Sequence, residues 1–279
     1  MSGRRRDGRP CPPQLPPSAL DRCDEIAARL TGDGRGAEAP SAALFLDFDG
    51  TLAPIVEHPD AAAIDPAARR AVERLAARLP VAVVSGRDRE DVAARVGLPA
   101  LTYAGSHGFD VAGPPCSGLR FLIGEETAPR LAAAAAEVAV ALAAVDGAEV
   151  EPKRSTVAVH YRRAAPGRWG EVEAAVDRAA AAHGLAKAAG KRVWELRPAL
   201  AWGKGRAVLR LLAETGLDAA GAVPLYVGDD VTDEDVFRAL AGRGVGIRVA
   251  SRPVETAAGY SLADPREVAT FLERLAAVV

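Results

Sequence analysis

The sequence predicts an α/β protein: a parallel sheet covered by helices on both faces, with a smaller α+β unit inserted into it. Two patterns indicate this fold class. Short apolar runs alternate with amphipathic helical runs over residues 42–105 and again after residue 203, which is typical of a buried parallel sheet. Between residues 114 and 199 the strand-like runs instead alternate polar and apolar residues, as half-exposed antiparallel strands do.

Residues 1–40 are predicted to precede the sheet as a disordered tail, a short helix and a linker. The tail is rich in proline, glycine and arginine, and such a composition buries too little apolar surface to fold. Apolar residues at helical spacing from Leu20 to Leu30 predict the helix. Ser18 and Asp21 have the spacing of a capping box that would open it.

The first part of the sheet is expected to follow the order β-α-β-α-β. Asp65 is a helix N-cap followed by Pro66 at the first helical position. Asp88 is expected to cap a second helix, which ends at Gly97. The three buried strands are expected at residues 42–47, 81–87 and 100–105.

The inserted unit, residues 114–199, divides the predicted core into residues 41–113 and 200–279. A long alanine-rich helix is expected from about Thr127 to Val145, and a second helix lies between two alternating runs. These runs occupy residues 148–162 and 191–198. The insertion is therefore predicted to be a separate α+β lid on the first domain.

The parallel pattern resumes after the insertion. A helix is expected from Gly203 to about Gly216, and a terminal amphipathic helix begins at Asp264-Pro265. Thr232 and Asp235 have the spacing of a second capping box. Two further buried strands are expected at residues 223–230 and 244–249.

Composition excludes several classes of protein. The net charge of −2 gives no reason to expect a nucleic-acid or membrane partner, and no apolar run has the length of a membrane span. No apolar segment follows the basic N-terminus, so no export signal is expected. Cys11, Cys23 and Cys116 are widely spaced, which disfavours a disulfide framework or zinc site and suits a reducing cytoplasm.

Polar residues follow several predicted strands and are expected to meet at one edge of the sheet, because ligands bind beyond the carboxyl ends of parallel strands. A single aspartate in such a place is usually a turn or helix cap, and a single lysine is usually solvated. The joint placement of residues from four separate segments is harder to explain in that way. These residues are Asp47, Asp49, Ser85, Lys204, Asp229, Asp230 and Asp233.

Such a set of side chains has a definite chemistry. Crowded carboxylates repel one another unless a cation lies among them, and hard oxygen ligands suit Mg²⁺ better than zinc. The cation, Lys204 and Ser85 would stabilise a transferring phosphoryl group. One strand-end carboxylate can attack phosphorus, forming an aspartyl-phosphate, while a second one two residues on faces the same way and can act as acid and base.

Four segments resemble the motifs of the haloacid dehalogenase-like (HAD) hydrolases in order. Asp47-Phe48-Asp49-Gly50-Thr51-Leu52 is similar to the DxDGT signature of that superfamily. The remaining motifs resemble Ser85-Gly86-Arg87, Lys204, and Gly228-Asp229-Asp230 with Asp233. The resemblance extends from about Ala42 to the C-terminus and implies a Rossmann-like parallel-sheet core with an inserted α+β cap.

The resemblance also implies a role for each residue. Asp47 would be the nucleophile and Asp49 the general acid and base. Mg²⁺ would be held by the side chains of Asp47 and Asp229 and by the backbone carbonyl of Asp49, with Asp230 and Asp233 in support. The residues expected to grip the phosphoryl end of the substrate are Ser85, Lys204, Thr51, Gly86 and Arg87.

Within this superfamily, five segments resemble the trehalose-6-phosphate phosphatases: DFDGTLAPI, GSHGFD, EPKRSTVAVHYR, KRVWELRP and YVGDDVTDEDVF. The implied reaction is Mg²⁺-dependent hydrolysis of trehalose 6-phosphate, coupled to a trehalose-6-phosphate synthase. One departure is Gly203, where the family usually carries aspartate. The residues implied to reach the sugar hydroxyls are Glu151, Lys153, Arg162, Lys191 and Glu195.

Other interpretations remain open on the sequence. The charged residues of the insertion can equally be cross-strand pairs on a solvated face. His107 is interpreted as a turn residue or one that supports the site, His160 as a sheet histidine, and Trp194 and Trp202 as packing between cap and core. Alternatives to the main function are a phosphatase of sucrose phosphate or mannosyl-phosphoglycerate, a phosphomutase, and a non-catalytic sugar-phosphate-binding module.

Overall fold

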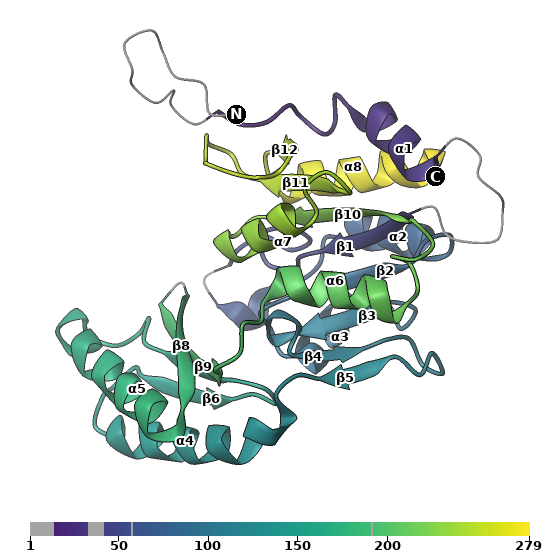
Figure 1. The fold of residues 1–279 in the computed structure, drawn as a ribbon. Coiled ribbons are helices and arrows are strands. Elements are labelled where there is room, and N and C mark those ends of the chain that lie inside the picture. The colour runs from purple at the N-terminus through teal and green to yellow at the C-terminus, as the bar shows by residue number, and fades with distance from the viewer. Residues whose placement is uncertain (1–13, 33–41, 57, 191) are drawn as a thin grey trace, which may run out of the picture.

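The computed structural model describes residues 14–32, 42–56, 58–190 and 192–279 (Figure 1). Most of the predicted tail and linker lies outside these ranges, as do Cys11 and Lys191. Within them, the chain forms one large mostly parallel sheet and one smaller antiparallel sheet. Figure 1 shows the smaller sheet and its two helices set to one side of the large sheet.

The large sheet has eight strands in the described residues, in the order β12-β11-β10-β1-β2-β3-β4-β5. The strands from β12 to β3 pair in parallel, whereas β4 and β5 pair antiparallel at one edge. The bounds are β1 Ala42–Leu46, β2 Val81–Val84, β3 Thr102–Gly105, β4 Asp110–Ala112, β5 Arg120–Leu122, β10 Val223–Gly228, β11 Val245–Val249 and β12 Tyr260–Leu262.

The burial of the central strand β1 explains why its sequence is a continuous apolar run. Leu44 and Leu46 belong to the core on one face of the sheet, and Phe45 belongs to the core on the other. A strand buried on both faces has no solvated side on which to place polar residues. The α/β fold class with both faces covered is therefore confirmed.

Helices cover the two faces of the large sheet, and Figure 1 shows α6 and α7 on the face opposite α2. Val72 of α2 and Phe271 of α8 belong to the same core as Leu44 and Leu46 of β1. Leu212 of α6 and Phe237 of α7 belong to the core on the other face, with Phe45. The bounds are α1 Cys23–Thr31, α2 Pro66–Ala76, α3 Arg89–Val96, α6 Lys204–Glu214, α7 Glu234–Ala239 and α8 Pro265–Val278. None of the described helices is both long and apolar enough to cross a membrane.

The N-terminal helix α1 packs into the core that the large sheet builds. Ile26 and Leu30 are buried among residues of α8 and the sheet. The predicted capping box is wrong, because the N-cap is Arg22, which makes no side-chain capping bond. The Ser18 hydroxyl instead accepts from the backbone N–H of Leu20.

The smaller unit, residues 128–198, is an antiparallel sheet of order β6-β7-β9-β8 packed on helices α4 and α5. Its strand β8 was not predicted, because half of Leu185–Gly190 is alanine and the segment lacks β-branched residues. Helix α4 ends at Ala141, before the expected Val145. The bounds are β6 Glu149–Pro152, β7 Val157–His160, β8 Leu185–Gly190, β9 Val193–Pro198, α4 Ala128–Ala141 and α5 Trp169–His183.

Two other expectations about boundaries differ from the structure. Strand β5 belongs to the large sheet, although everything after residue 113 was expected in the insertion; three residues are too few to show a sheet pattern. The predicted capping box at Thr232 is wrong, because Asp230 and Asp233 form it. A 3₁₀ turn, Val231–Asp233, precedes α7 and moves the cap two residues earlier. The caps at Asp65, Asp88 and Asp264 are confirmed.

Candidate active site

The carboxyl ends of β1, β2 and β10 place the predicted motifs at one edge of the large sheet. Asp47 directly follows β1 and is fixed there by its backbone N–H, which donates to the Val227 carbonyl at 2.9 Å. Ser85 follows β2, and Asp229 follows β10. Since β1 lies between β2 and β10, these three loops are neighbours.

Lys204, the first residue of α6, lies between two of the predicted aspartates. Its Nζ donates to Asp47 Oδ1 at 2.7 Å and to Asp233 Oδ1 at 2.8 Å. All three residues are buried. Burial raises the pKa of Asp47 well above its usual range, although Lys204 opposes this. Burial works against the charge on Lys204, but Asp233 and Asp47 raise its pKa overall, so Lys204 remains a cation.

Asp233 is held by several groups at once. Besides Lys204, its Oδ1 accepts from the Tyr226 hydroxyl at 2.6 Å, and its Oδ2 accepts from the backbone N–H of Asp230 at 2.8 Å. Although burial opposes it, Lys204 lowers the pKa of Asp233. Tyr226 was missed by the sequence reasoning, because an aromatic residue inside an apolar strand is normally core. Asp233 therefore orients the lysine and also belongs to a group of three neighbouring carboxylates.

The acidic group can accommodate a metal ion. Carboxylate oxygens of Asp47, Asp229 and Asp233 lie within 4.8 Å of one another in the described residues. Gly50 has φ +84°, and a Cβ added there would overlap the Asp229 carboxylate, so only glycine allows this approach. Three carboxylates face one lysine ammonium, which leaves negative charge for a divalent cation to offset. The donor set is all oxygen and fits a hard cation.

Asp49 is not a member of that group, and its carboxylate is held by Arg87. The guanidinium donates to both carboxylate oxygens, Nε to Oδ2 at 2.7 Å and Nη2 to Oδ1 at 2.8 Å. Arg87 also donates to Asp91 at 3.0 Å. Burial opposes the charge on Arg87, but its bonds to Asp49 raise its pKa overall. The predicted substrate contact Arg87 thus fixes the predicted acid and base, and the Asp49 side chain lies outside the acidic group.

The other residues predicted to bind the phosphoryl end of the substrate lie in the neighbouring loops. Ser85 is buried, and its hydroxyl accepts from the backbone N–H of Arg87 at 3.1 Å. Thr51 is also buried, and its hydroxyl has no hydrogen-bond partner among the described residues. The Gly86 carbonyl accepts from Lys153 Nζ at 3.4 Å. Lys153 thereby brings the smaller unit into contact with the loop after β2.

The predicted sugar-binding residues divide into two groups. Lys153 and the buried Glu195 face the large sheet; Glu195 accepts from Thr156 at 2.9 Å and lies 3.5 Å from His107. Glu151 instead contacts His160 on the neighbouring strand at 2.8 Å. This contact matches the other interpretation of the charged residues, as cross-strand pairs on a solvated face. Arg162 is exposed just beyond β7.

The tryptophans differ from one another. Trp194 stacks on Tyr161 with ring centroids 6.1 Å apart, and Lys187 Nζ lies over its ring. Trp194 packs against the core of the smaller unit, so its expected packing between the two units is wrong. Trp202, in the segment between β9 and α6, packs against Phe109 of the large-sheet part at 6.4 Å. The expected packing of Trp202 between cap and core is consistent with this contact.

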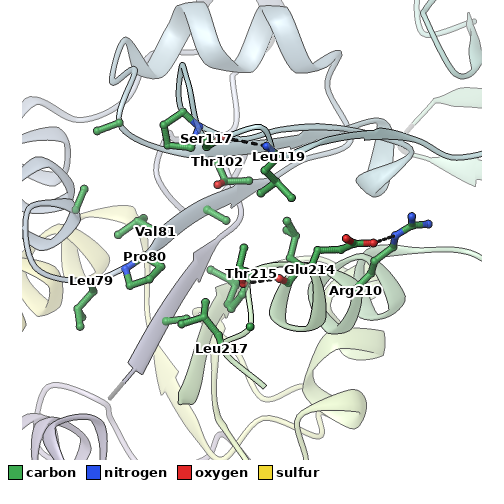
Figure 2. Close-up of a pocket in the computed structure, with 18 of the residues that line it drawn as sticks. Leu79, Pro80, Val81, Thr102, Ser117, Leu119, Arg210, Glu214, Thr215 and Leu217 are labelled. Atoms are coloured by element: carbon green, nitrogen blue, oxygen red, sulfur yellow. Dashed lines mark hydrogen bonds and ion pairs between the residues drawn. The ribbon is translucent and has the colours of Figure 1, made fainter. Parts of the chain in front are cut away.

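A cavity of about 1030 Å³ opens at the amino ends of the parallel strands, opposite the end that carries the predicted motifs (Figure 2). It is lined by the start of β2 at Val81, the start of β3 at Thr102, and residues Thr215 and Leu217 beyond α6. None of the predicted site residues lines it. The acidic group and the lysine therefore identify the candidate active site independently of this cavity.

Comparisons with known proteins agree with the geometry. A family model described as trehalose-phosphatase matches residues 45–266. The chain is 46% identical over 257 residues to a trehalose-phosphate phosphatase from Mycobacterium tuberculosis, an alignment that covers 91% of this chain and 65% of that protein. The chain thus spans less than two thirds of the length of that curated relative.

Solved structures share the fold. The trehalose-6-phosphate phosphatase of Aspergillus fumigatus matches with a TM-score of 0.66 and 27% identity, covering 95% of this chain and all of that one. A haloacid dehalogenase-like hydrolase from Bacteroides thetaiotaomicron matches with a TM-score of 0.61 and 16% identity over 84% of this chain and 98% of that one, which shows the fold alone. The chain has the HAD fold and belongs to the trehalose-phosphatase family.

Proposed function

We propose that this chain hydrolyses trehalose 6-phosphate to trehalose and phosphate through an aspartyl-phosphate on Asp47. The observation that carries the proposal is the position of Lys204, 2.7 Å from Asp47 and 2.8 Å from Asp233, two members of the acidic group that Asp229 completes. A carboxylate fixed by a lysine within an acidic group suits attack on phosphorus with charge stabilisation nearby. Family membership favours trehalose 6-phosphate over sucrose phosphate, mannosyl-phosphoglycerate or a phosphomutase substrate.

The proposed cation is Mg²⁺, held by Asp47 and Asp229, with Asp233 beside them and the Asp49 carbonyl as the further ligand expected from the family. When bound, the ion neutralises negative charge on the phosphoryl oxygens. Asp230 supports this arrangement by capping the turn that carries Asp233. The all-oxygen donor set favours Mg²⁺ over zinc.

In the first step an Asp47 carboxylate oxygen bonds to phosphorus, and the bond from phosphorus to the sugar oxygen breaks. Asp49 gives its proton to that leaving oxygen. In the second step Asp49 takes a proton from water, the water oxygen bonds to phosphorus, and Asp47 is released with its electron pair. To reach the leaving oxygen, Asp49 must free one oxygen from Arg87, which keeps Asp91 as a partner.

The smaller unit is proposed to act as the cap that binds the sugar, with residues 114–199 as the predicted insertion. Lys153 and Glu195 support this role, because both lie against the loops of the large sheet. Glu151 and Arg162 are proposed to join them when substrate is bound, and Lys191 lies outside the described residues. Charged donors and acceptors on such strands can make paired hydrogen bonds to hydroxyls.

We also propose a cytoplasmic location and functional coupling to a trehalose-6-phosphate synthase. The free thiols of Cys23 and Cys116 agree with a reducing compartment. The synthase is proposed because hydrolysis of this substrate requires an enzyme that makes it.

Phosphate release from a panel of sugar phosphates, with Mg²⁺ and with EDTA, tests the function. We expect trehalose 6-phosphate to be hydrolysed at least about tenfold faster than the others, EDTA to abolish release, and Asp47→Asn to lose about 10³-fold or more. Asp60→Asn is the control, since that carboxylate is fully exposed. Retained activity in Asp47→Asn contradicts the nucleophile, and equal turnover of several sugars contradicts the substrate. Tight binding without phosphate release would favour the non-catalytic module.

A further inference from the structure

The turn after β3 is a strained segment that holds the loop after β2. Ser106 and His107 both adopt left-handed backbone conformations, with φ of +48° and +57°. Residues other than glycine rarely adopt this conformation. The backbone N–H of Ser106 donates to the Arg87 carbonyl at 2.7 Å, and that of His107 donates to the Ser85 carbonyl at 2.8 Å. The strain therefore serves to fix His107 beside the phosphoryl-binding loop.

The ring of His107 fills the space between that loop and the smaller unit. A Cβ added at Gly86 would lie 2.9 Å from its Cε1 atom, so the ring packs directly on the glycine backbone. The Nε2 atom of His107 also lies 3.5 Å from Oε2 of Glu195 on β9. The second oxygen of Glu195 accepts from Thr156 at 2.9 Å. Glu195 is thus fixed from one side and approached by histidine from the other.

The surroundings of His107 favour a neutral ring. Burial lowers its pKa, and although Glu195 opposes this, the cations Lys204, Lys153 and Arg197 lower it further. A neutral imidazole can carry its hydrogen on Nε2 and donate it to Glu195. The 3.5 Å separation is longer than a hydrogen bond, so a small closing movement of β9 is enough to form one.

We propose that His107 is a positioning residue that orients the Glu195 carboxylate toward the sugar and ties that orientation to the phosphoryl-binding loop. The proposal rests on the proposed function, because it assigns Glu195 to sugar binding. It predicts that the ring matters for a disaccharide phosphate and not for a phosphate ester too small to reach Glu195. Trehalose 6-phosphate and p-nitrophenyl phosphate provide that comparison.

Three substitutions separate the ring atoms from the backbone. His107→Gly removes the ring and keeps the left-handed turn without strain. His107→Asn also tolerates the turn but places its amide near the Nδ1 position, too short to reach Glu195. His107→Gln places an amide N–H near the Nε2 position. The control is His183→Ala, which removes another histidine–glutamate contact, 2.9 Å to Glu137, within the smaller unit.

We expect His107→Gly and His107→Asn to raise the KM for trehalose 6-phosphate about tenfold with kcat changed less than about threefold. The kcat/KM for p-nitrophenyl phosphate should stay within about twofold, and His107→Gln should recover most of the lost affinity. In combination with Glu195→Gln, His107→Gly should add little to the single substitution, because the two side chains act as one unit.

Equal losses on both substrates, or additive effects with Glu195→Gln, would overturn the proposal and leave His107 with a purely structural role. Unchanged kinetics in all three variants would overturn it as well, while the proposed function stands. Wild-type protein that hydrolyses p-nitrophenyl phosphate and not trehalose 6-phosphate contradicts the proposed function itself, and the role of His107 falls with it.

Discussion

Charged side chains at the carboxyl ends of the large sheet and on the smaller unit are held in different ways. At the large sheet, Lys204, Asp47 and Asp233 are buried in contact with one another. On the smaller unit, Glu151 with His160 and Glu149 with Arg163 form partly exposed pairs. Buried charges are costly unless each is paired, whereas exposed pairs contribute little. The first region therefore suits the proposed chemistry, and the second can rearrange around the sugar that it is proposed to bind.

The largest effect is expected from removing the buried cation. Lys204→Met leaves Asp47 and Asp233 buried without their shared partner, so activity should fall at least about a hundredfold. The free energy of unfolding should fall by about 3 kcal/mol. Phosphate release and urea denaturation measure the two quantities.

The matched substitution in the smaller unit is Lys187→Met. In the unchanged protein, the Lys187 ammonium contacts Glu173 at 2.9 Å. It should change the free energy of unfolding by about 1 kcal/mol or less. Similar losses in the two variants would remove the distinction between the regions.

A second test concerns the metal site. Gly50→Ala forces a Cβ into the Asp229 carboxylate, so the Mg²⁺ concentration for half-maximal phosphate release should rise about 10- to 100-fold. Gly216→Ala is the control, because φ is also positive there, at +72°, and an added Cβ meets nothing within 4 Å. An unchanged Mg²⁺ requirement in Gly50→Ala would place the ion elsewhere.

A third test concerns the two hydrogen bonds by which Arg87 holds the Asp49 carboxylate. Arg87→Lys replaces a planar group that bonds both carboxylate oxygens with a single ammonium, so kcat should fall about tenfold. The same exchange at Arg163, which pairs with Glu149 at 2.6 Å on the smaller unit, should leave kcat unchanged. If the two variants behave alike in steady-state kinetics, orientation of Asp49 by Arg87 is not needed.

The smallest effect is expected at Glu151. Its hydrogen bond to His160 lowers its pKa, so the stabilisation is present above the ordinary glutamate pKa and disappears as the pH falls through the lowered value. The side chain is about half exposed, with 47% accessible, and solvent screening limits the contribution to about 0.5 kcal/mol. Glu151→Gln, followed by urea denaturation from pH 7 to pH 3, checks this; a larger loss would mean a structural role.

Much of the site could be predicted because its signals are local. Asp47, Ser85 and Asp229 each stand directly after an apolar run, and parallel strands bring such positions together whatever the details of packing. The caps at Asp65 and Asp88 depend on neighbours a few residues away. Local patterns of this kind survive in the fold.

The rest depends on partners that are distant in the sequence. Tyr226 reads as an ordinary strand residue, yet its hydroxyl bonds to Asp233. The pairing of Arg87 with Asp49, and the approach of His107 to Glu195, join separate elements through side-chain geometry. No spacing rule identifies such pairs. Strand β8 was missed for a different reason, since packing on α5 outweighs its weak intrinsic preference.

The position of Asp47 immediately after the central strand has a consequence for how the protein loses activity as it unfolds. Strand β1 hydrogen-bonds to a neighbour along both of its edges, so its amides should exchange with solvent only when the whole core opens. The proposed nucleophile therefore lies on the part of the molecule that we expect to unfold last. Activity should persist up to the global transition, and loss of catalysis on heating should coincide with loss of the core.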